Sequence, residues 1–103
     1  GPIKTNNEFT VLLDGEKLSE LILIRGKKDG DKFQPLGMEK GSIKLSDFFI
    51  NEKVMQAARE KWPLVTDCND RIIWVPGYRP SQEYRITEST KRIIKMSVSK
   101  KIS

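Results

Sequence analysis

The chain has 103 residues, of which 37% are hydrophobic and 32% charged, and a formal net charge of +5. This size predicts one folded domain. Histidine is absent and Cys68 is the single cysteine, which excludes Ser-His-Asp and Cys-His nucleophiles, His-containing zinc sites and an internal disulfide.

From the same composition we expect no catalysis, metal or cofactor in this chain. The lone thiol fits a reducing, cytoplasmic setting. No apolar run approaches the ~20 residues that span a bilayer, and no signal-peptide pattern is present, so we expect no membrane partner. Gly1-Pro2 indicates a protease scar from an engineered fragment.

The first half begins with two predicted strands. "EFTVLL" (8–13) is rich in strand-forming residues, and Asp14-Gly15 predicts a turn after it. "LILIR" (21–25) has consecutive apolar positions, which favours a strand buried on both faces.

The stretch from Gly30 to Met38 combines turn-forming and apolar residues. Asp29-Gly30 predicts a turn, and Pro35 with Gly37 predicts a rigid corner. We expect Phe33 and Leu36 to anchor that corner in the core.

Two short helices are predicted next. Leu45, Phe48 and Phe49 recur with helical spacing, with Ser42 or Ser46 as the N-cap and Asp47 in the first turn. A second helical pattern, Val54, Ala57, Ala58 and Trp62, ends at Pro63. Whether Asn51 separates two helices or lies within one bent helix stays open.

The second half returns to strand patterns. We expect strands over 71–77, 83–86 and 92–99, with turns at 68–70 and 87–90. Residues 100–103 are expected to fray. This order predicts an α+β domain, a small layered β/β/α arrangement with mixed strands and two short helices.

Basic residues concentrate in two segments. Residues 25–61 carry nine basic and six acidic side chains, and residues 81–103 carry six and two. This distribution favours a polyanionic partner if the fold brings the segments together, although an ordinary solvated surface explains the charge equally well.

The candidate phosphate contacts lie near predicted turns and helix starts. Trp62, Trp74, Phe48 and Phe49 fit the core pattern, so we expect contact with nucleic-acid backbone and shape rather than with splayed bases. A protein-interaction module that uses the exposed face of the last strand is an open alternative. The basic candidates are Arg25, Lys27, Lys28 and Lys32 around the Asp29-Gly30 turn, Lys40 and Lys44 at the first helix, and Arg79 after a strand.

A nucleotide-binding P-loop is excluded. "GMEKGS" (37–42) has three residues between its glycines where Walker A has four, and no lysine precedes Ser42. The Gly-x-Gly-x-x-Gly pattern is also absent.

Four consecutive blocks carry a family resemblance. They read "IRGKKDGDKFQPLGMEKGSIKLSDFFINEKV", "REKWPLV", "IIWVPGYR" and "RITESTKR". Together, over about residues 22–98, they resemble the C-terminal domain of the tRNA(Ile)-lysidine synthetases (TilS family). Two departures are Ile43, where the family often has a lysine, and Met55, where it often has a proline.

The resemblance implies the function of a larger enzyme. Such enzymes use ATP to adenylate the wobble cytidine of a minor isoleucine tRNA and then attach lysine, in an N-terminal PP-loop domain whose Ser-Gly-Gly-x-Asp-Ser signature is absent here. It implies a PheT/TilS-like fold, related to one in phenylalanyl-tRNA synthetase β subunits, that binds the tRNA body and acceptor region. The basic positions matching the family pattern are Arg25, Lys32, Lys44, Arg59 and Arg79.

On this basis we divide the chain into a scar and lead-in strand (1–20), a lysidine synthetase C-terminal tRNA-binding domain (21–99) and a frayed tail (100–103). The expected partners are tRNA and the catalytic domain of the same polypeptide, with ATP bound in the missing N-terminal domain. The alternative is an interdomain docking or protein-interaction module that touches tRNA little.

Overall fold

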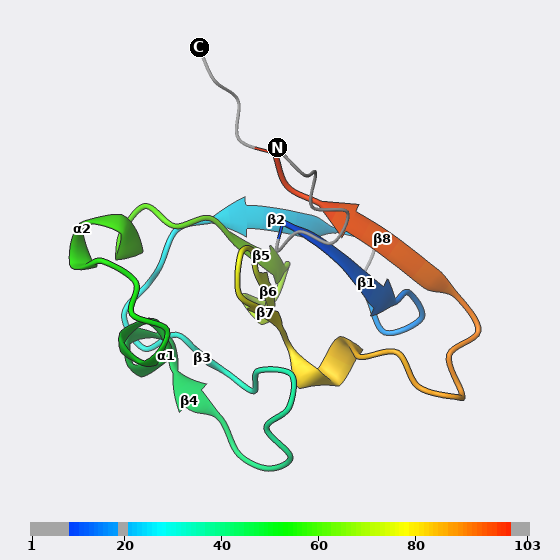
Figure 1. Cartoon of the computed structure of the whole chain (residues 1–103). Coiled ribbons are helices and arrows are strands. Elements are labelled where there is room, and N and C mark those ends of the chain that lie inside the picture. The colour runs from blue at the N-terminus through cyan, green and yellow to red at the C-terminus, as the bar shows by residue number, and fades with distance from the viewer. Residues whose placement is uncertain (1–8, 19–20, 100–103) are drawn as a thin grey trace, which may run out of the picture.

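The computed structural model describes residues 9–18 and 21–99 (Figure 1). Predictions for Gly1-Pro2 and for residues 100–103 lie outside this range. The described part contains short strands, two α-helices and one 3₁₀ helix. In chain order they are β1 Thr10–Asp14, β2 Ile22–Arg25, β3 Lys32–Phe33, β4 Ile43–Lys44, α1 Leu45–Asn51, α2 Gln56–Arg59, β5 Leu64–Asp67, β6 Ile72–Val75, β7 Arg79–Pro80, η1 Gln82–Tyr84 and β8 Ile93–Ser97.

The centre of the domain is a four-stranded sheet in the order β2-β5-β6-β7. Two further strand pairs, β1-β8 and the β3-β4 ribbon, lie on opposite sides of it (Figure 1). The predicted layered α+β architecture with two short helices is confirmed. The pairings among the described strands are all antiparallel rather than mixed.

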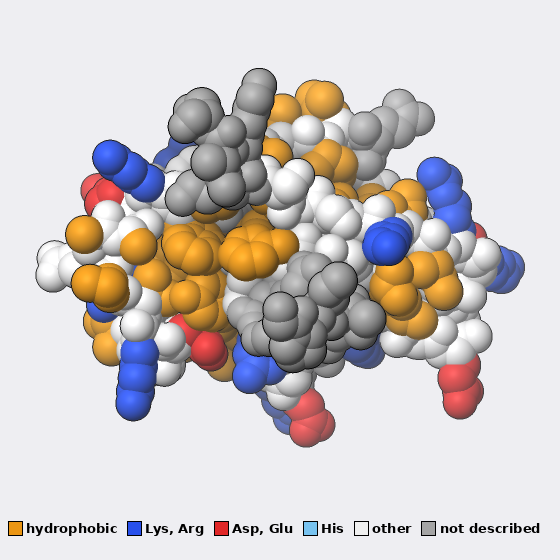
Figure 2. Space-filling model, turned by 45° about the horizontal axis from the view of Figure 1, so that its top comes forward, with side chains coloured by type: hydrophobic (Ala, Val, Ile, Leu, Met, Phe, Trp, Pro, Cys, Tyr) orange, Lys and Arg blue, Asp and Glu red, His pale blue; other side chains and the backbone are white. Residues whose placement is uncertain are grey.

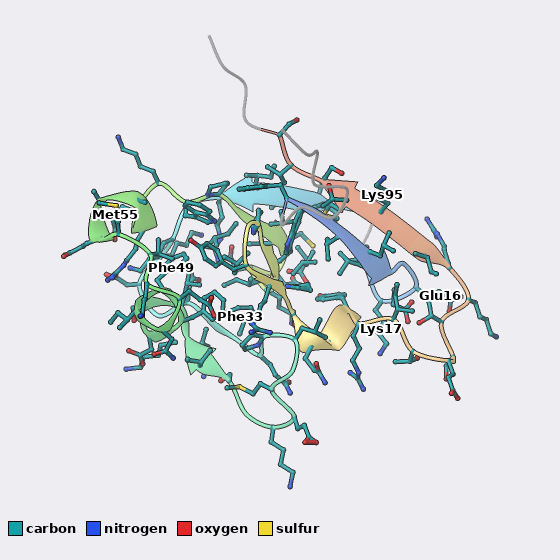
Figure 3. All side chains as sticks on the ribbon, viewed as in Figure 1. Glu16, Lys17, Phe33, Phe49, Met55 and Lys95 are labelled. Atoms are coloured by element: carbon teal, nitrogen blue, oxygen red, sulfur yellow. The ribbon has the colours of Figure 1, made fainter. Side chains whose placement is uncertain are left out.

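The core consists of two clusters, one on each face of the central sheet. Successive strand residues point to opposite faces, and the neighbours Leu64 and Val65 on β5 belong to different clusters. Phe33 and Phe49 pack in the cluster beside α1 and point into the interior (Figure 3). Trp74, 1% exposed, packs in the cluster beside β1. The aromatic residues that the sequence assigned to the core therefore lie in or against it.

The two helices are separate. α1 ends at Asn51, and Lys53 adopts a positive φ of 61° before α2 begins. The predicted serine N-cap of α1 is wrong, because Lys44 occupies that position and makes no side-chain cap hydrogen bond. Instead, the backbone N–H of Leu45 donates to the carbonyl of Asp31 at 2.8 Å, so the preceding loop supplies an acceptor at the helix start.

Two strand predictions differ from the structure. Residues 82–84 form the 3₁₀ helix η1, in which the Ser81 hydroxyl accepts a hydrogen bond from the Glu83 N–H at 3.3 Å. The sequence reading also missed β5, the strand directly after Pro63, although all four of its residues are buried. Its Leu-Val-Thr run is short, but Val and Thr favour strands.

The prediction that residues 21–25 are buried on both faces is wrong. β2 pairs only with β5 among the described residues, which places it at the edge of the sheet. Leu21, Leu23 and Ile24 are 55%, 41% and 63% exposed. A run of apolar residues therefore does not distinguish a central strand from an exposed edge strand.

The structure confirms the turns predicted for residues 30–38 but only one of the two predicted core anchors. Gly30 and Gly37 have positive φ values of 88° and 102°, which favour glycine and confirm the turns. Phe33 is buried at 6% exposure, but Leu36 is 38% exposed, so its predicted role as a core anchor is wrong. The backbone N–H of Leu36 donates to the carbonyl of Pro80 at 2.8 Å, and backbone pairing rather than a side chain holds this end of the corner.

Candidate nucleic-acid interface

The β3-β4 ribbon presents two lysines side by side. Lys32 of β3 pairs directly with Lys44 of β4 in the antiparallel register, so both side chains project from the same face of the ribbon. Both residues are exposed. No carboxylate in residues 9–18 or 21–99 forms a salt bridge with either lysine. Like charges directly opposite each other destabilise a strand pair, and an anion between them would remove the repulsion.

An open pocket of about 100 Å³ lies beside this ribbon. Three lysines and a serine line it, and ammonium and hydroxyl groups are donors that suit a phosphate. Asp29 also lines it, and a carboxylate there would oppose an anion. The pocket is lined by Lys27, Lys28, Asp29, Gly30, Asp31, Lys44 and Ser46.

Arg25 holds the base of the pocket together. Its guanidinium donates two hydrogen bonds of 2.9 Å to the two carboxylate oxygens of Asp31, and its Nε donates to Asp70 at 3.1 Å. The Arg25 and Asp31 side chains are only 14% and 11% exposed. Arg25 thus connects β2 to the 28–31 turn and to the β5-β6 turn, and its donors already have acceptors.

Asp31 organises the same turn from the other side. Its carboxylate accepts the backbone N–H of Lys28 at 2.8 Å, in addition to the Arg25 contacts. Burial alone would raise the pKa of Asp31, but the hydrogen bonds from Arg25 and Lys28 outweigh it and lower the pKa below its ordinary value. The hydrogen bond to Asp31 correspondingly raises the pKa of Arg25. The pair is therefore ionised at neutral pH and fixes the turn that carries Lys27 and Lys28.

Arg79 braces the other end of the ribbon loop. Its Nη1 donates to the carbonyl of Leu36 at 3.2 Å, and its Nε lies 4.0 Å from a carboxylate oxygen of Glu52. The side chain remains 52% exposed. Gly37 N–H also donates to the Gln82 side chain at 3.0 Å, so the loop is held against β7 and η1.

The other predicted cations differ in their exposure and in whether they already pair with an acceptor. Lys27 is largely buried and lies 3.5 Å from Glu60. Lys28 is 59% exposed and shares Asp70 with Arg25 at 3.4 Å. Arg59 donates to the carbonyl of Val54 at 2.8 Å. Lys40 is exposed in the ribbon loop. The fold thus brings Lys27, Lys28, Lys32 and Lys44 to one region, and uses Arg25 and Arg59 for internal contacts.

The two basic segments touch at the start of the second one, where the Gln82 N–H donates to the Gln34 carbonyl at 2.7 Å, but the strand of the second segment lies elsewhere. β8, which lies in the basic C-terminal segment, pairs with β1 on the far side of the central sheet from the ribbon (Figure 1). Lys95 projects from that strand, away from the ribbon (Figure 3). The condition attached to the charge argument is therefore met only in part: Lys95 of β8 lies away from the ribbon, and the candidate site uses Arg79 and cations of the 25–61 segment.

Sequence reasoning missed two kinds of residue at the site. Ser46, predicted as a possible helix cap, instead lines the pocket. Asp31 and Asp70 position the cations, and the pairing of Asp70 with residues more than 40 positions away had no signal in the sequence. Asp31 lies six residues after Arg25, a spacing that matters only once the turn is known.

The described residues contain no group of three or more Cys, Asp or Glu side chains suited to a metal ion. In the same part of the chain, no helix has the length and hydrophobicity to cross a membrane.

Comparison with known proteins decides the family. The sequence model of the "TilS substrate C-terminal domain" matches residues 22–97. The chain belongs to this family. It is 36% identical over 93 residues to the tRNA(Ile)-lysidine synthase of Caldanaerobacter subterraneus subsp. tengcongensis, and 40% identical over 90 residues to that of Clostridium tetani. These alignments cover 90% and 87% of this chain but 20% and 19% of the relatives, so the chain spans about one-fifth of their length.

Solved structures agree with this assignment. A crystal structure of a TilS C-terminal domain matches with a TM-score of 0.70 and 26% identity, covering 97% of this chain and 78% of the other. An N-terminal fragment of the phenylalanyl-tRNA synthetase β subunit from Pyrococcus horikoshii matches with a TM-score of 0.63 and 23% identity, covering 84% and 26%. The second likeness shows a shared fold and confirms the fold relation expected from the sequence.

Proposed function

We propose that this TilS-family domain binds tRNA through the phosphate backbone, as part of a tRNA(Ile)-lysidine synthase that joins lysine to the wobble cytidine with ATP. In this proposal ATP and the chemistry belong to the remainder of a longer polypeptide. The domain described here contributes affinity for the tRNA and helps to hold the tRNA in position. Lysine and arginine side chains gain affinity for RNA by releasing counterions from phosphates, without needing a particular base sequence.

The observation that carries the proposal is the opposed pair Lys32 and Lys44 beside the lysine-lined pocket. A strand pair with facing lysines and no neutralising carboxylate among the described residues is unfavourable without a ligand. A phosphate between the two ammonium groups would accept charge-assisted hydrogen bonds from both. The relatives are named as tRNA(Ile)-lysidine synthases, so we take tRNA(Ile) as the polyanion.

We assign the predicted cations two roles. Lys28, Lys32, Lys40, Lys44 and Arg79 are the proposed phosphate contacts, since each is exposed. The less exposed cations instead position the surface, because each already pairs with an acceptor. Arg25 pairs with Asp31, Lys27 with Glu60, and Arg59 with the Val54 carbonyl. Five phosphate contacts predict a dissociation constant in the micromolar range or weaker at physiological salt, on the order of 10⁻⁶–10⁻⁴ M.

Titration of tRNA(Ile) at several salt concentrations tests the proposal. Contact with about five phosphates predicts that the logarithm of the association constant falls with the logarithm of salt concentration at a slope near −4. The double variant Lys32→Ala/Lys44→Ala should weaken binding and reduce the steepness of that slope by roughly 2, about 1 for each contact removed.

Lys95→Ala is the matched control, because Lys95 is an exposed strand lysine on the opposite side of the sheet. We expect it to leave the slope within about 0.5 of the unmodified chain. Salt-independent binding, or equal losses from Lys95 and from the ribbon lysines, would contradict the proposed site. A circular dichroism spectrum of each variant separates lost contact from unfolding.

A further inference from the structure

The turn from Pro35 to Met38 fixes the orientation of one peptide group at the surface. The Met38 N–H donates to the Pro35 carbonyl at 2.9 Å, and Gly37, at the third position of the turn, has a φ of 102°. A positive φ at this position is that of a type II turn, in which the central peptide is turned over relative to a type I turn. Glycine adopts this φ without strain. Gly37 therefore selects the orientation of the peptide between Leu36 and Gly37.

Two side chains hold that peptide at its two ends. The Gly37 N–H donates to Oε1 of Gln82 at 3.0 Å, and the Leu36 carbonyl accepts from Nη1 of Arg79 at 3.2 Å. The N–H and the carbonyl of a trans peptide point in opposite directions, so Gln82 and Arg79 contact it from opposite sides. Hydrogen bonds linked through one peptide polarise and strengthen each other. The position of the Arg79 guanidinium therefore depends on Gln82.

Gln82 is itself held by the backbone around it. It is the first residue of η1, and its N–H donates to the Gln34 carbonyl at 2.7 Å. The side-chain amide of Gln34 in turn donates to the Met38 carbonyl. An N–H group requires an oxygen opposite it and a carbonyl requires a donor, so the partners fix the orientation of both amides. The two glutamines thus tie the turn to η1.

Arg79 keeps donors for a ligand. Its Nη1 contacts the Leu36 carbonyl, and its Nε lies 4.0 Å from Glu52, beyond hydrogen-bond length. The remaining N–H groups can form the two parallel hydrogen bonds by which a guanidinium binds a phosphate. Figure 2 shows several Lys and Arg side chains that extend singly away from the surface. Arg79 differs from such side chains because the backbone of the turn holds its guanidinium.

We propose that Gln82 is a positioning residue for tRNA binding, which holds Arg79 through the Leu36–Gly37 peptide in the orientation that receives a backbone phosphate. The inference rests on the proposed function, in which Arg79 is a phosphate contact. Binding normally costs the conformational entropy of the side chains that it immobilises. A guanidinium that is already held loses less of this entropy. Gln82 therefore raises the affinity without contacting the RNA.

A double-mutant cycle on the 103-residue chain, read out as tRNA(Ile) affinity at one salt concentration, tests the inference. Gln82→Met keeps the length of the side chain and removes the acceptor, and should weaken binding by about two- to tenfold, the range for one hydrogen bond. Arg79→Ala should weaken binding by about tenfold. In the Arg79→Ala background, Gln82→Met should cause no further loss, because it acts only through Arg79.

Two further variants make the cycle specific. Gly37→Ala disfavours the type II turn and should give the same loss as Gln82→Met, with the same dependence on Arg79. Gln56→Met is the matched control, because Gln56 is an exposed glutamine on α2, away from the turn (Figure 1). We expect it to leave tRNA affinity unchanged.

The amide resonance of Gly37 reports the hydrogen bond directly. In ¹H–¹⁵N spectra, Gln82→Met should move this resonance upfield and leave the core resonances in place, which separates a lost contact from unfolding. Equal losses from Gln82→Met in the two backgrounds, or no loss while Arg79→Ala weakens binding, would overturn the inference. Full affinity of the Arg79→Ala variant would also overturn it. Binding by Lys32 and Lys44 would then still stand, because their double variant tests it separately.

Discussion

The β3-β4 ribbon and the edge strand β2 are two solvent-facing strand regions with opposite chemistry. The ribbon sets Lys32 against Lys44, which repel each other. β2 exposes the aliphatic side chains of Leu23 and Ile24 to water, one on each face of the sheet. At the ribbon the domain keeps a charge repulsion that a bound anion would remove, whereas at β2 it keeps isolated apolar side chains in water. Unneutralised facing charges, as at Lys32 and Lys44, therefore indicate the kind of ligand a surface binds, whereas single exposed apolar side chains do not.

The largest expected effect concerns how the ribbon is anchored. Phe33, 6% exposed, packs edge-to-face on Phe48 with ring centroids 5.0 Å apart. Phe33→Ala should lower the free energy of unfolding by about 3–5 kcal/mol, measured by urea denaturation. Leu36→Ala, at a 38% exposed site in the same corner, should cost less than about 1 kcal/mol. Equal losses would show that Leu36 is an anchor after all.

A smaller effect is expected for the turn that carries the pocket lysines. Asp31→Asn removes the charge partner of Arg25, and we expect a loss of about 2 kcal/mol in unfolding free energy at pH 7. The pKa of Asp31 is lowered in the folded state, so its contribution is complete above its ordinary pKa of 3.8 and is lost as the pH falls through the folded value.

Denaturation curves of the unmodified chain and of the Asp31→Asn variant, recorded between pH 7 and pH 2.5, measure the difference in their unfolding free energies. It should stay constant down to about pH 4 and shrink below it. A difference that is the same at every pH would mean that Asp31 acts through shape rather than through charge.

The smallest effect sharpens the account of the β2 edge. Ile24 and Val65 face each other across the β2-β5 pair, yet Ile24 is 63% exposed and Val65 is 1% exposed. In the 103-residue chain, Ile24→Thr should change the unfolding free energy by less than about 0.5 kcal/mol. Val65→Thr should cost about 1–3 kcal/mol, because it buries a hydroxyl. Thermal melts compare the two; a large loss from Ile24→Thr would show that β2 is already covered in this domain.

The sequence predicted the fold class, both helices and the aromatic core, because those signals are local periodicities. It failed where a residue's environment depends on the neighbouring strand. The apolar residues of β2 indicate a strand but carry no information on whether a second strand flanks it. β5 was missed even though it is one of the two central strands of the sheet and all four of its residues are buried.

The candidate site shows the same division. The basic residues near the Asp29-Gly30 turn could be identified from sequence as possible phosphate ligands. The sequence could not show which of these side chains already have a carboxylate partner, because Arg25 is engaged by Asp70, 45 residues away. The facing of Lys32 and Lys44 likewise depends on strand register, which the intervening loop of residues 34–42 does not specify.

The substitution Lys44→Glu tests the central claim most directly, through tRNA affinity and stability measured on the same protein. Glutamate opposite Lys32 and at the start of α1 should leave the unfolding free energy unchanged or raise it by about 0.2–1 kcal/mol. It should also weaken tRNA binding and make the salt slope shallower by about 1–2. Lys95→Glu, the same charge change on β8, should leave both tRNA affinity and salt slope nearly unchanged. Lys44→Glu binding with unaltered affinity and slope would contradict the account.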